Sequence, residues 1–196
     1  MFRDFSKPME GYFSIKIINA DGTYDLYEEH NKIMDSGRVN MAKIMSSTES
    51  FSINYLKIGN RGTESGSNTV PLDFSTTRTK LFSEVDSDAT WLRFELPVLT
   101  NGDETSSFSK KGLFKDTDED TGDDAENTTI TTTVENNKVT FKVSLPIKAG
   151  VPSGDTLISY EEAALYIGDE IFSMKTFPAR VKDYNVSFEI SWSITF

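Results

Sequence analysis

The chain offers little material for nucleophilic or acid–base catalysis. It has one histidine, His30, and no cysteine, so a cysteine–histidine pair is impossible and a serine nucleophile has a single possible base. His30 stands beside Glu28, Glu29 and Asn31 at a predicted strand end, where a surface or capping role is the ordinary one. Paired carboxylates from distant positions could still hydrolyse a glycoside, but the densest carboxylates fall in a predicted loop, which is a poor frame for such work. We therefore expect no enzyme activity.

The acidic segment contains a pattern that suits a metal loop. Asp116, Asp118 and Asp120 have the alternate spacing that oxygen-preferring cations such as calcium favour. An EF-hand loop would need glycine at its sixth position and glutamate at its twelfth, whereas Gly122 is at the seventh and Glu126 at the eleventh. Calcium binding by these three residues is therefore one hypothesis, but we favour the interpretation that the segment is a solvated acidic loop without a metal. We expect no cofactor.

Two further patterns are candidate ligand sites. Residues 59–62 (GNRG) lack the lysine–serine ending and the following helix of a phosphate-binding loop, so they are interpreted as the start of a surface loop that extends to Pro71. Tyr24, Tyr27 and Trp91 could stack on sugar rings, but scattered aromatic residues in β proteins more often pack in cross-strand pairs. Carbohydrate binding therefore stays an alternative function.

The elements that must position any site are mostly strands, and the clearest strand is the C-terminal stretch. Six large apolar side chains recur there at every second position: Val186, Phe188, Ile190, Trp192, Ile194 and Phe196. A period of two places them all on one face of a sheet. Burying each contributes about 1.5–3 kcal/mol. We therefore expect this strand to run through the core, with its end held inside the fold.

Similar alternation predicts the other strands. They are expected at residues 12–18, 24–27, 51–58, 91–96, 128–134, 139–145, 157–167 and 171–177, with 77–85 as an ambiguous edge. One short helix is expected at 36–45, capped by Asp35 or Ser36 and weakened by Gly37. The pattern is typical of a mainly β protein: an antiparallel, jelly-roll-like β-sandwich of eight or nine strands with one short helix.

Length and composition set the class of protein. The chain has 196 residues, 37% of them hydrophobic and 14 of them Phe, which is enough for the core of one domain, 1–196. We expect an N-terminal arm, 1–11, and an acidic loop insertion, 101–127. The net charge of −11 disfavours nucleic acid and anionic membranes as partners. We find no secretory h-region and no run long enough to span a bilayer, so we expect synthesis in a cytoplasm.

Several stretches together resemble a known family. They are residues 30–38 (HNKIMDSGR) before the helix, 53–59 (INYLKIG) before a polar loop, 158–165 (ISYEEAAL), 171–178 (IFSMKTFP) and the closing 188–196 (FEISWSITF). This layout is similar to that of the small β-rich structural proteins of tailed bacteriophages, which occur among tail, baseplate, neck and fibre-attachment components. The acidic insertion is not expected of that family.

The resemblance implies a non-enzymatic structural subunit of a tailed-phage virion, assembled in the host cytoplasm. As a homo-oligomer, it would bridge neighbouring tail, neck or collar, or baseplate proteins. We expect its contacts with other virion structural proteins at the arm, the polar loop and the acidic insertion. The named interface residues are Phe2, Phe5, Pro8, Asn60 and Arg61. The alternative is a host-receptor or carbohydrate-binding module of a tail fibre.

Overall fold

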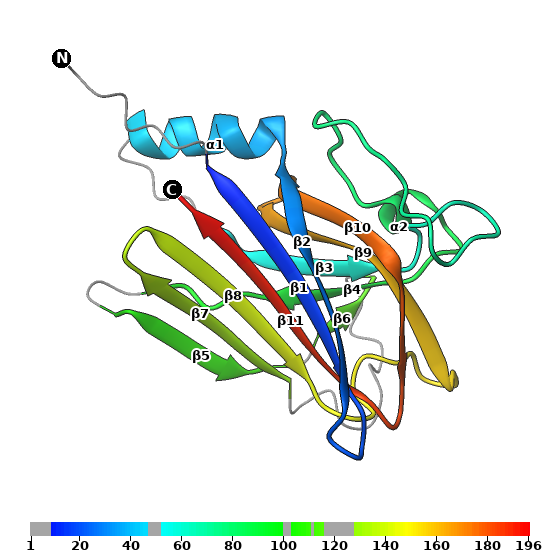
Figure 1. Ribbon diagram of the computed structural model, residues 1–196. Helices are drawn as coiled ribbons and strands as arrows, with labels where there is room; N and C mark the ends of the chain where they lie inside the picture. Colours follow the sequence, from blue (N-terminus) through cyan, green and yellow to red (C-terminus); the bar gives the residue numbers. More distant parts are fainter. Residues whose placement is uncertain (1–8, 47–51, 100–102, 111, 116–127) are drawn as a thin grey trace.

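Eleven strands of the described chain form one antiparallel sheet that curls into a half-barrel (Figure 1). The computed structural model describes residues 9–46, 52–99, 103–110, 112–115 and 128–196. The strands are β1 (Glu10–Ile18), β2 (Tyr24–Ile33), β3 (Tyr55–Gly59), β4 (Trp91–Glu95), β5 (Thr105–Ser109), β6 (Leu113–Phe114), β7 (Thr129–Glu135), β8 (Lys138–Leu145), β9 (Leu157–Ile167), β10 (Glu170–Asp183) and β11 (Ser187–Thr195). The helices are α1 (Asp35–Ser46) and α2 (Phe82–Val85).

The mainly β, antiparallel class is confirmed, but the sandwich of eight or nine strands is wrong. The strands follow the order β5-β7-β8-β11-β1-β2-β10-β9-β3-β4-β6 in a single sheet. The sheet has two halves, one from β5 to β2 and one from β10 to β6 in this order. They join where Ile33 and Lys32 of β2 pair with Ser173 and Met174 of β10. Next to this junction the β9–β10 ladder has two irregularities in register, and such bulges bend a strand and increase its twist. The sheet therefore curls and does not split into two layers.

The closing strand lies inside the sheet, as predicted. β11 pairs with β1 along one edge and with β8 along the other. Four of its predicted core side chains are fully buried: Phe188, Ile190, Trp192 and Ile194. The two outer members of the pattern are exceptions. Val186 is half-buried just before the strand, and Phe196 is 44% exposed just after it, so the chain end is not enclosed.

The core is continuous across the curl of the sheet. The Trp192 ring packs edge-to-face on Phe13 with centroids 5.0 Å apart, and Phe13 stacks on Phe177 of β10 at 5.1 Å. Tyr27 of β2 completes this aromatic group, 5.9 Å from Phe177. Aromatic pairs in these geometries add to the stabilisation from burial alone. The group therefore links β11 and β1 to β10 through side chains, where few backbone bonds join the two halves.

Helix α1 lies across the end of the half-barrel where β1 begins and β11 ends (Figure 1). The predicted helix is confirmed, and it begins at Asp35. Gly37 permits its close approach to β10, because a Cβ there would lie 2.3 Å from the carbonyl oxygen of Phe172. Ser36 fastens the same turn by donating to the carbonyl of Ile171 at 2.5 Å. The glycine that lowers helix propensity is thus required by packing.

Other boundaries differ from the prediction. Residues 77–85 form no edge strand; instead their end is the short helix α2, because Glu162 of β9 accepts hydrogen bonds from the backbone N–H groups of Phe82 and Ser83. The described part of the 101–127 insertion contributes β5 and β6, so it is not simply a loop. Strand β2 continues to Ile33. Of the predicted arm 1–11, residues 10–11 belong to β1 and 1–8 lie outside the described residues.

Candidate functional site

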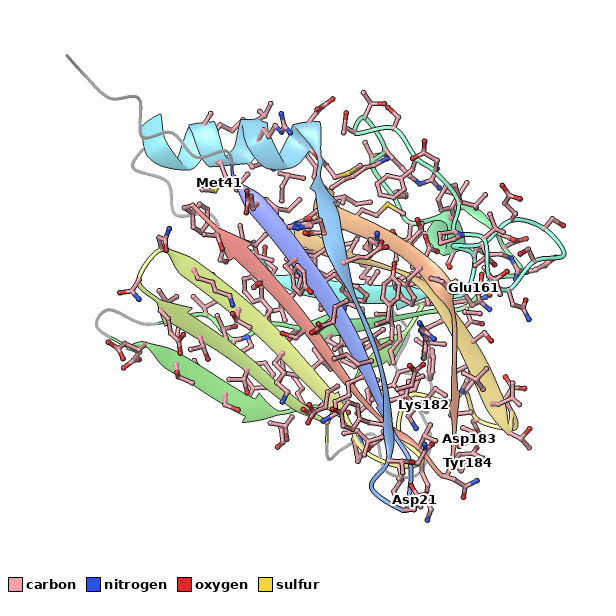
Figure 2. All side chains as sticks on the ribbon, viewed as in Figure 1. Asp21, Met41, Glu161, Lys182, Asp183 and Tyr184 are labelled. Atoms are coloured by element: carbon pink, nitrogen blue, oxygen red, sulfur yellow. The ribbon has the colours of Figure 1, made fainter. Side chains whose placement is uncertain are left out.

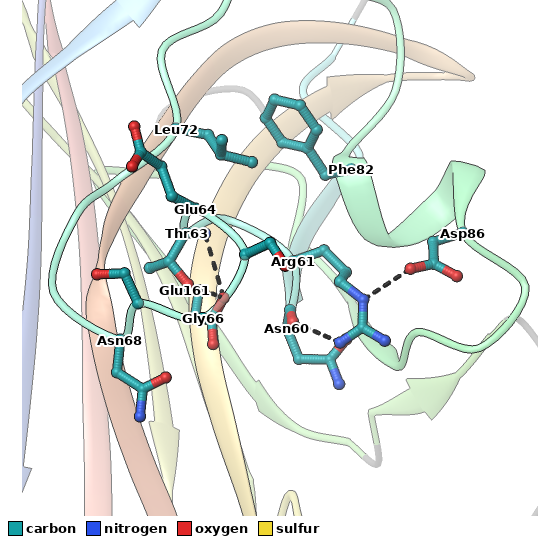
Figure 3. Close-up of a pocket in the computed structure, with 12 residues that line it drawn as sticks. Asn60, Arg61, Thr63, Glu64, Gly66, Asn68, Leu72, Phe82, Asp86 and Glu161 are labelled. Carbon is teal, nitrogen blue, oxygen red and sulfur yellow. Dashed lines mark hydrogen bonds and ion pairs between the residues drawn. The ribbon is translucent and has the colours of Figure 1, made fainter.

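A pocket of about 700 Å³ opens between the loop after β3 and strand β9 (Figure 3). We call it the polar pocket, and its lining residues are Asn60, Arg61, Thr63, Glu64, Ser65, Gly66, Ser67, Asn68, Leu72, Phe82, Asp86 and Glu161. Its volume falls within the range of about 300–1,000 Å³ that is usual for ligand pockets. Most of these side chains are polar, and Phe82 supplies one aromatic ring.

The loop that forms the pocket is held in place at both its base and its tip. At the base, the side-chain oxygen of Asn60 accepts from the N–H of Thr90 at 2.8 Å. The two arms of the loop pair where the N–H of Leu72 donates to the carbonyl of Gly62 at 2.8 Å. At the tip, the N–H of Ala179 in β10 donates to the carbonyl of Asn68 at 2.8 Å. The pocket wall is therefore fixed to β10 and to the segment before β4.

Glu161 forms the floor of the polar pocket. It projects from β9 and is only 9% exposed. Its Oε2 accepts from both the N–H and the hydroxyl of Thr63, at 3.2 and 2.7 Å. Its Oε1 has no hydrogen-bond donor among the described residues. Gly62 lets the loop approach this strand, because a Cβ there would lie 2.0 Å from the Glu161 carbonyl oxygen.

Two charged contacts shape the pocket rim. Arg61 Nε donates to Asp86 at 2.7 Å, as the dashed line in Figure 3 shows, and this bond holds the pKa of Asp86 below its usual range. On the other side, the guanidinium of Arg78 lies 3.5 Å from the centroid of the Phe82 ring. Arg78 is not among the lining residues, so this stacking holds the ring from outside the pocket.

A buried polar network supports the pocket from below. Lys57 forms an ion pair with Glu84 at 2.6 Å, and both side chains are less than 10% exposed. Tyr166 donates its hydroxyl to Glu84, and burial together with the charge of Glu84 raises the tyrosine pKa. Burial also raises the pKa of Glu162, although its bonds to the start of α2 oppose the shift. These groups satisfy one another, as buried polar networks must, so the network anchors α2 to β3 and β9.

A second, apolar pocket of about 450 Å³ lies at the other end of the half-barrel. We call it the apolar groove, and its lining includes Met41, Val98, Phe141, Phe172, Ile194 and Phe196. One buried polar atom in its wall, Oγ1 of Thr132, has no hydrogen-bond partner among the described residues. Figure 2 shows Met41 beneath α1 and Glu161 beside α2, so the two pockets are in separate parts of the molecule.

Lys182 is the other buried ionisable group of note, and Figure 2 labels it near the turn before β11. Burial lowers its pKa to about 8, an effect that the nearby Asp183 partly opposes. Its ammonium donates to the carbonyl of Asp183 at 2.8 Å. It lines neither pocket, so we assign it no chemistry.

His30 lies within β2 and not at a strand end. Its ring is exposed and meets Tyr12 edge-to-face at 5.6 Å. In the described part of the chain it has no hydrogen bond to a serine or a carboxylate. The candidate sugar-stacking aromatics differ from one another: Tyr24 is exposed, Tyr27 packs on Phe177, and Trp91 is buried. The burial of Trp91 leaves its ring unavailable to a ligand, in keeping with the packing role that the sequence favoured.

The predicted interface and metal residues divide into two groups. Asn60 and Arg61 both line the polar pocket, where Asn60 braces the loop and Arg61 pairs with Asp86. The rest lie outside the described residues: Phe2, Phe5, Pro8, Asp116, Asp118 and Asp120. Elsewhere in the described chain, no group of three or more histidine, aspartate or glutamate residues is placed to hold a metal ion.

Sequence reasoning missed Glu161 and Phe82, the two residues that give the polar pocket its character. A signal for the first was present, because residues 161–162 place two carboxylates inside the mostly apolar strand β9. Carboxylates are rarely buried without a partner. For Phe82, nothing local marks its role.

The comparisons add no assignment. No family model, curated protein or solved structure matches the chain. Among the described residues, no helix has the length and apolar character needed to cross a membrane.

Proposed function

We propose that the chain is a non-enzymatic structural subunit of a tailed-phage particle, and that it bridges neighbouring tail, neck or baseplate proteins as part of an oligomer. The sequence resemblance suggests the particle. The observation that carries the proposal in the structure is the outer edge of β5, where the half-barrel stays open. The predicted contacts of Phe2, Phe5 and Pro8 remain part of this proposal.

The backbone of β5 presents free hydrogen-bonding groups along that edge. On its inner side, Lys110 N donates to Thr128 O and Val134 N donates to Glu104 O, in line with the β5–β7 register. The N–H and C=O groups of successive residues point to opposite sides of a strand, so the even-numbered residues of β5 bond to β7. The N–H and C=O groups of the odd-numbered residues therefore point away from it. Within the described chain no strand pairs with them.

This edge lacks the usual devices against pairing. Strand β5 reads TSSFS, with no charge and no proline. Natural edge strands are normally protected by lysine, proline or a bulge. An unprotected edge is suited to strand addition, in which backbone bonds supply affinity. Symmetric repetition in a ring then multiplies weak contacts.

The Ser107→Pro variant is expected to lose incorporation into particles. Proline removes one outward N–H without removing an inner ladder bond, and it is tolerated on edge strands. Quantitative mass spectrometry of purified particles should find the unaltered chain at a fixed symmetric copy number and the variant at least about tenfold lower, the effect of about 1.4 kcal/mol per contact.

Ser107→Ala is the matched control. It also loses the hydroxyl contact with Thr131, which is 3.0 Å long, but it keeps the backbone N–H. We expect it to incorporate like the unaltered chain. Incorporation of the proline variant at the normal copy number would remove the edge from the proposal. Absence of the unaltered chain from particles would remove the virion role itself.

The rival function, a host-receptor or carbohydrate-binding module of a tail fibre, depends on a different part of the molecule. The feature that favours it is the polar pocket, with Phe82 beside polar groups.

A further inference from the structure

We propose that the polar pocket is a binding site for a neutral or amino sugar. The inference does not depend on the assembly role, because the pocket lies beside β9 and α2 and contains no residue of β5. Four properties of the pocket carry it: a rigid frame, free hydrogen-bonding groups, an aromatic ring and an excess of negative charge.

The frame is preorganised. The loop wall is bonded to β10 through Asn68, and its base is bonded through Asn60 to the segment before β4. The bridge between Thr63 and Pro71 closes the loop into a narrow hairpin. Weak ligands such as monosaccharides gain from such a frame, because little ordering entropy is lost on binding.

The hydrogen-bonding groups match sugar hydroxyls. Oε1 of Glu161 is a free acceptor on a side chain more than nine-tenths buried, at the pocket floor. The side-chain nitrogen of Asn60 is a donor without a bonded partner among the described residues, since only its oxygen is engaged, by Thr90. A hydroxyl both donates and accepts, so adjacent hydroxyls can satisfy a carboxylate and an amide together.

Phe82 supplies the apolar surface that a sugar also requires. Its ring is half-buried and lines the pocket, and Arg78 stacks on it at 3.5 Å. The C–H face of a pyranose is apolar, and an immobilised ring can cover it at low entropic cost. In Figure 3 the ring lies near Leu72.

The charge of the lining selects among sugars. Glu64, Asp86 and Glu161 contribute three carboxylates, whereas Arg61 contributes the single guanidinium and is already paired with Asp86. Glu161 is buried, so its field is less screened than that of an exposed group. An acidic sugar would meet repulsion from these carboxylates, and no unpaired cation among the described lining residues would receive its own carboxylate. Neutral sugars and amino sugars would not.

Saturation-transfer NMR on the full chain tests the proposal. The probes are methyl glucoside, methyl galactoside and glucosamine, with glucuronic acid and N-acetylneuraminic acid as the acidic comparison. We expect at least one neutral or amino sugar to bind with a Kd on the order of 1 mM, and the acidic sugars to bind at least about tenfold more weakly.

Two variants identify the site. Glu161→Gln keeps an oxygen for Thr63 and replaces the free acceptor with a donor, so binding should weaken by about tenfold or more. Phe82→Leu keeps apolar volume and removes the ring face, and it should weaken binding similarly. Tyr24→Ala removes an exposed ring elsewhere and should change nothing. Thermal melts establish that each variant is folded.

Three outcomes would overturn the proposal. The first is no signal from any neutral or amino sugar, and the second is binding of the acidic sugars as tight as that of the neutral ones. The third is a loss of binding in Tyr24→Ala while both pocket variants still bind normally. None of these outcomes bears on particle incorporation, so the site and the assembly role fail separately.

Discussion

Trp192→Ala is expected to lower the free energy of unfolding by about 3–5 kcal/mol, the usual cost of removing a buried aromatic side chain. The Trp192 side chain is 0% exposed, and its strand pairs it with Phe13 on one side and Phe141 on the other. Domains of ordinary size are stable by only about 5–15 kcal/mol. Urea unfolding followed by circular dichroism should therefore show a large fall in midpoint, or a chain that is partly unfolded without urea.

Phe196→Ala provides the matched control for this loss. Phe196 belongs to the same alternating pattern, but it is 44% exposed and lies beyond the end of β11. We expect a loss below about 1 kcal/mol, because truncating a half-exposed side chain leaves little cavity. Equal losses in the two variants would contradict the placement of β11 at the centre of the core.

Glu84→Met is expected to cost about 3–5 kcal/mol, the usual loss when one member of a buried ion pair is removed. The other member is Lys57, whose ammonium lies between the rings of Trp91 and Tyr166, 4.5 Å from each centroid. The rings recover part of the loss through cation–π attraction. The variant also removes the nearer of two acceptors of the Leu81 N–H, Glu84 at 2.9 Å, and leaves only the Tyr166 hydroxyl at 3.3 Å, so α2 should loosen. Urea unfolding measures the change.

A double-mutant cycle makes this prediction specific. Lys57→Met should cost less than Glu84→Met, because Glu84 keeps the Tyr166 hydroxyl and the Leu81 N–H as donors. The free energy of unfolding that the double variant loses should be smaller than the sum of the two single losses by about 1–3 kcal/mol, the coupling usual for contacting residues. Additive losses would show that the ion pair is not formed in solution.

Strands β8 and β11 were predictable because apolar and polar side chains alternate along them. In each strand the apolar face is more buried than the polar one, and a period of two has a single structural interpretation. The curl of the sheet was not predictable, because a sandwich and a half-barrel place the same side chains inward. The difference depends on two residue pairs between β2 and β10, which no local pattern marks.

Short elements were missed for related reasons. α2 has four residues and begins because Glu162, distant in sequence, accepts its first N–H groups. Four of the five residues of β5 are serine or threonine, which are as typical of loops as of exposed strands, and its place in an acidic segment favoured a loop.

The candidate site was the least predictable part. Asn60 and Arg61 were identified as loop residues with a role in contacts, yet their loop closes over a strand about 100 residues away, as the bonds of Thr63 to Glu161 show. Sequence spacing carries no information on such a contact. Only the carboxylates at 161–162, placed inside a mostly apolar strand, hinted that something polar lies beneath.

Hydrogen exchange of the β5 amides, measured by NMR on the free chain and after assembly, tests the central claim most directly. In the free chain, the amides of Ser106 and Phe108 should be protected by β7, whereas the amide of Ser107 should exchange freely. In the assembled state the account predicts that Ser107 becomes protected as well. Exchange of Ser107 at the same unprotected rate in both states would show that the open edge of the half-barrel is not where neighbouring subunits bind.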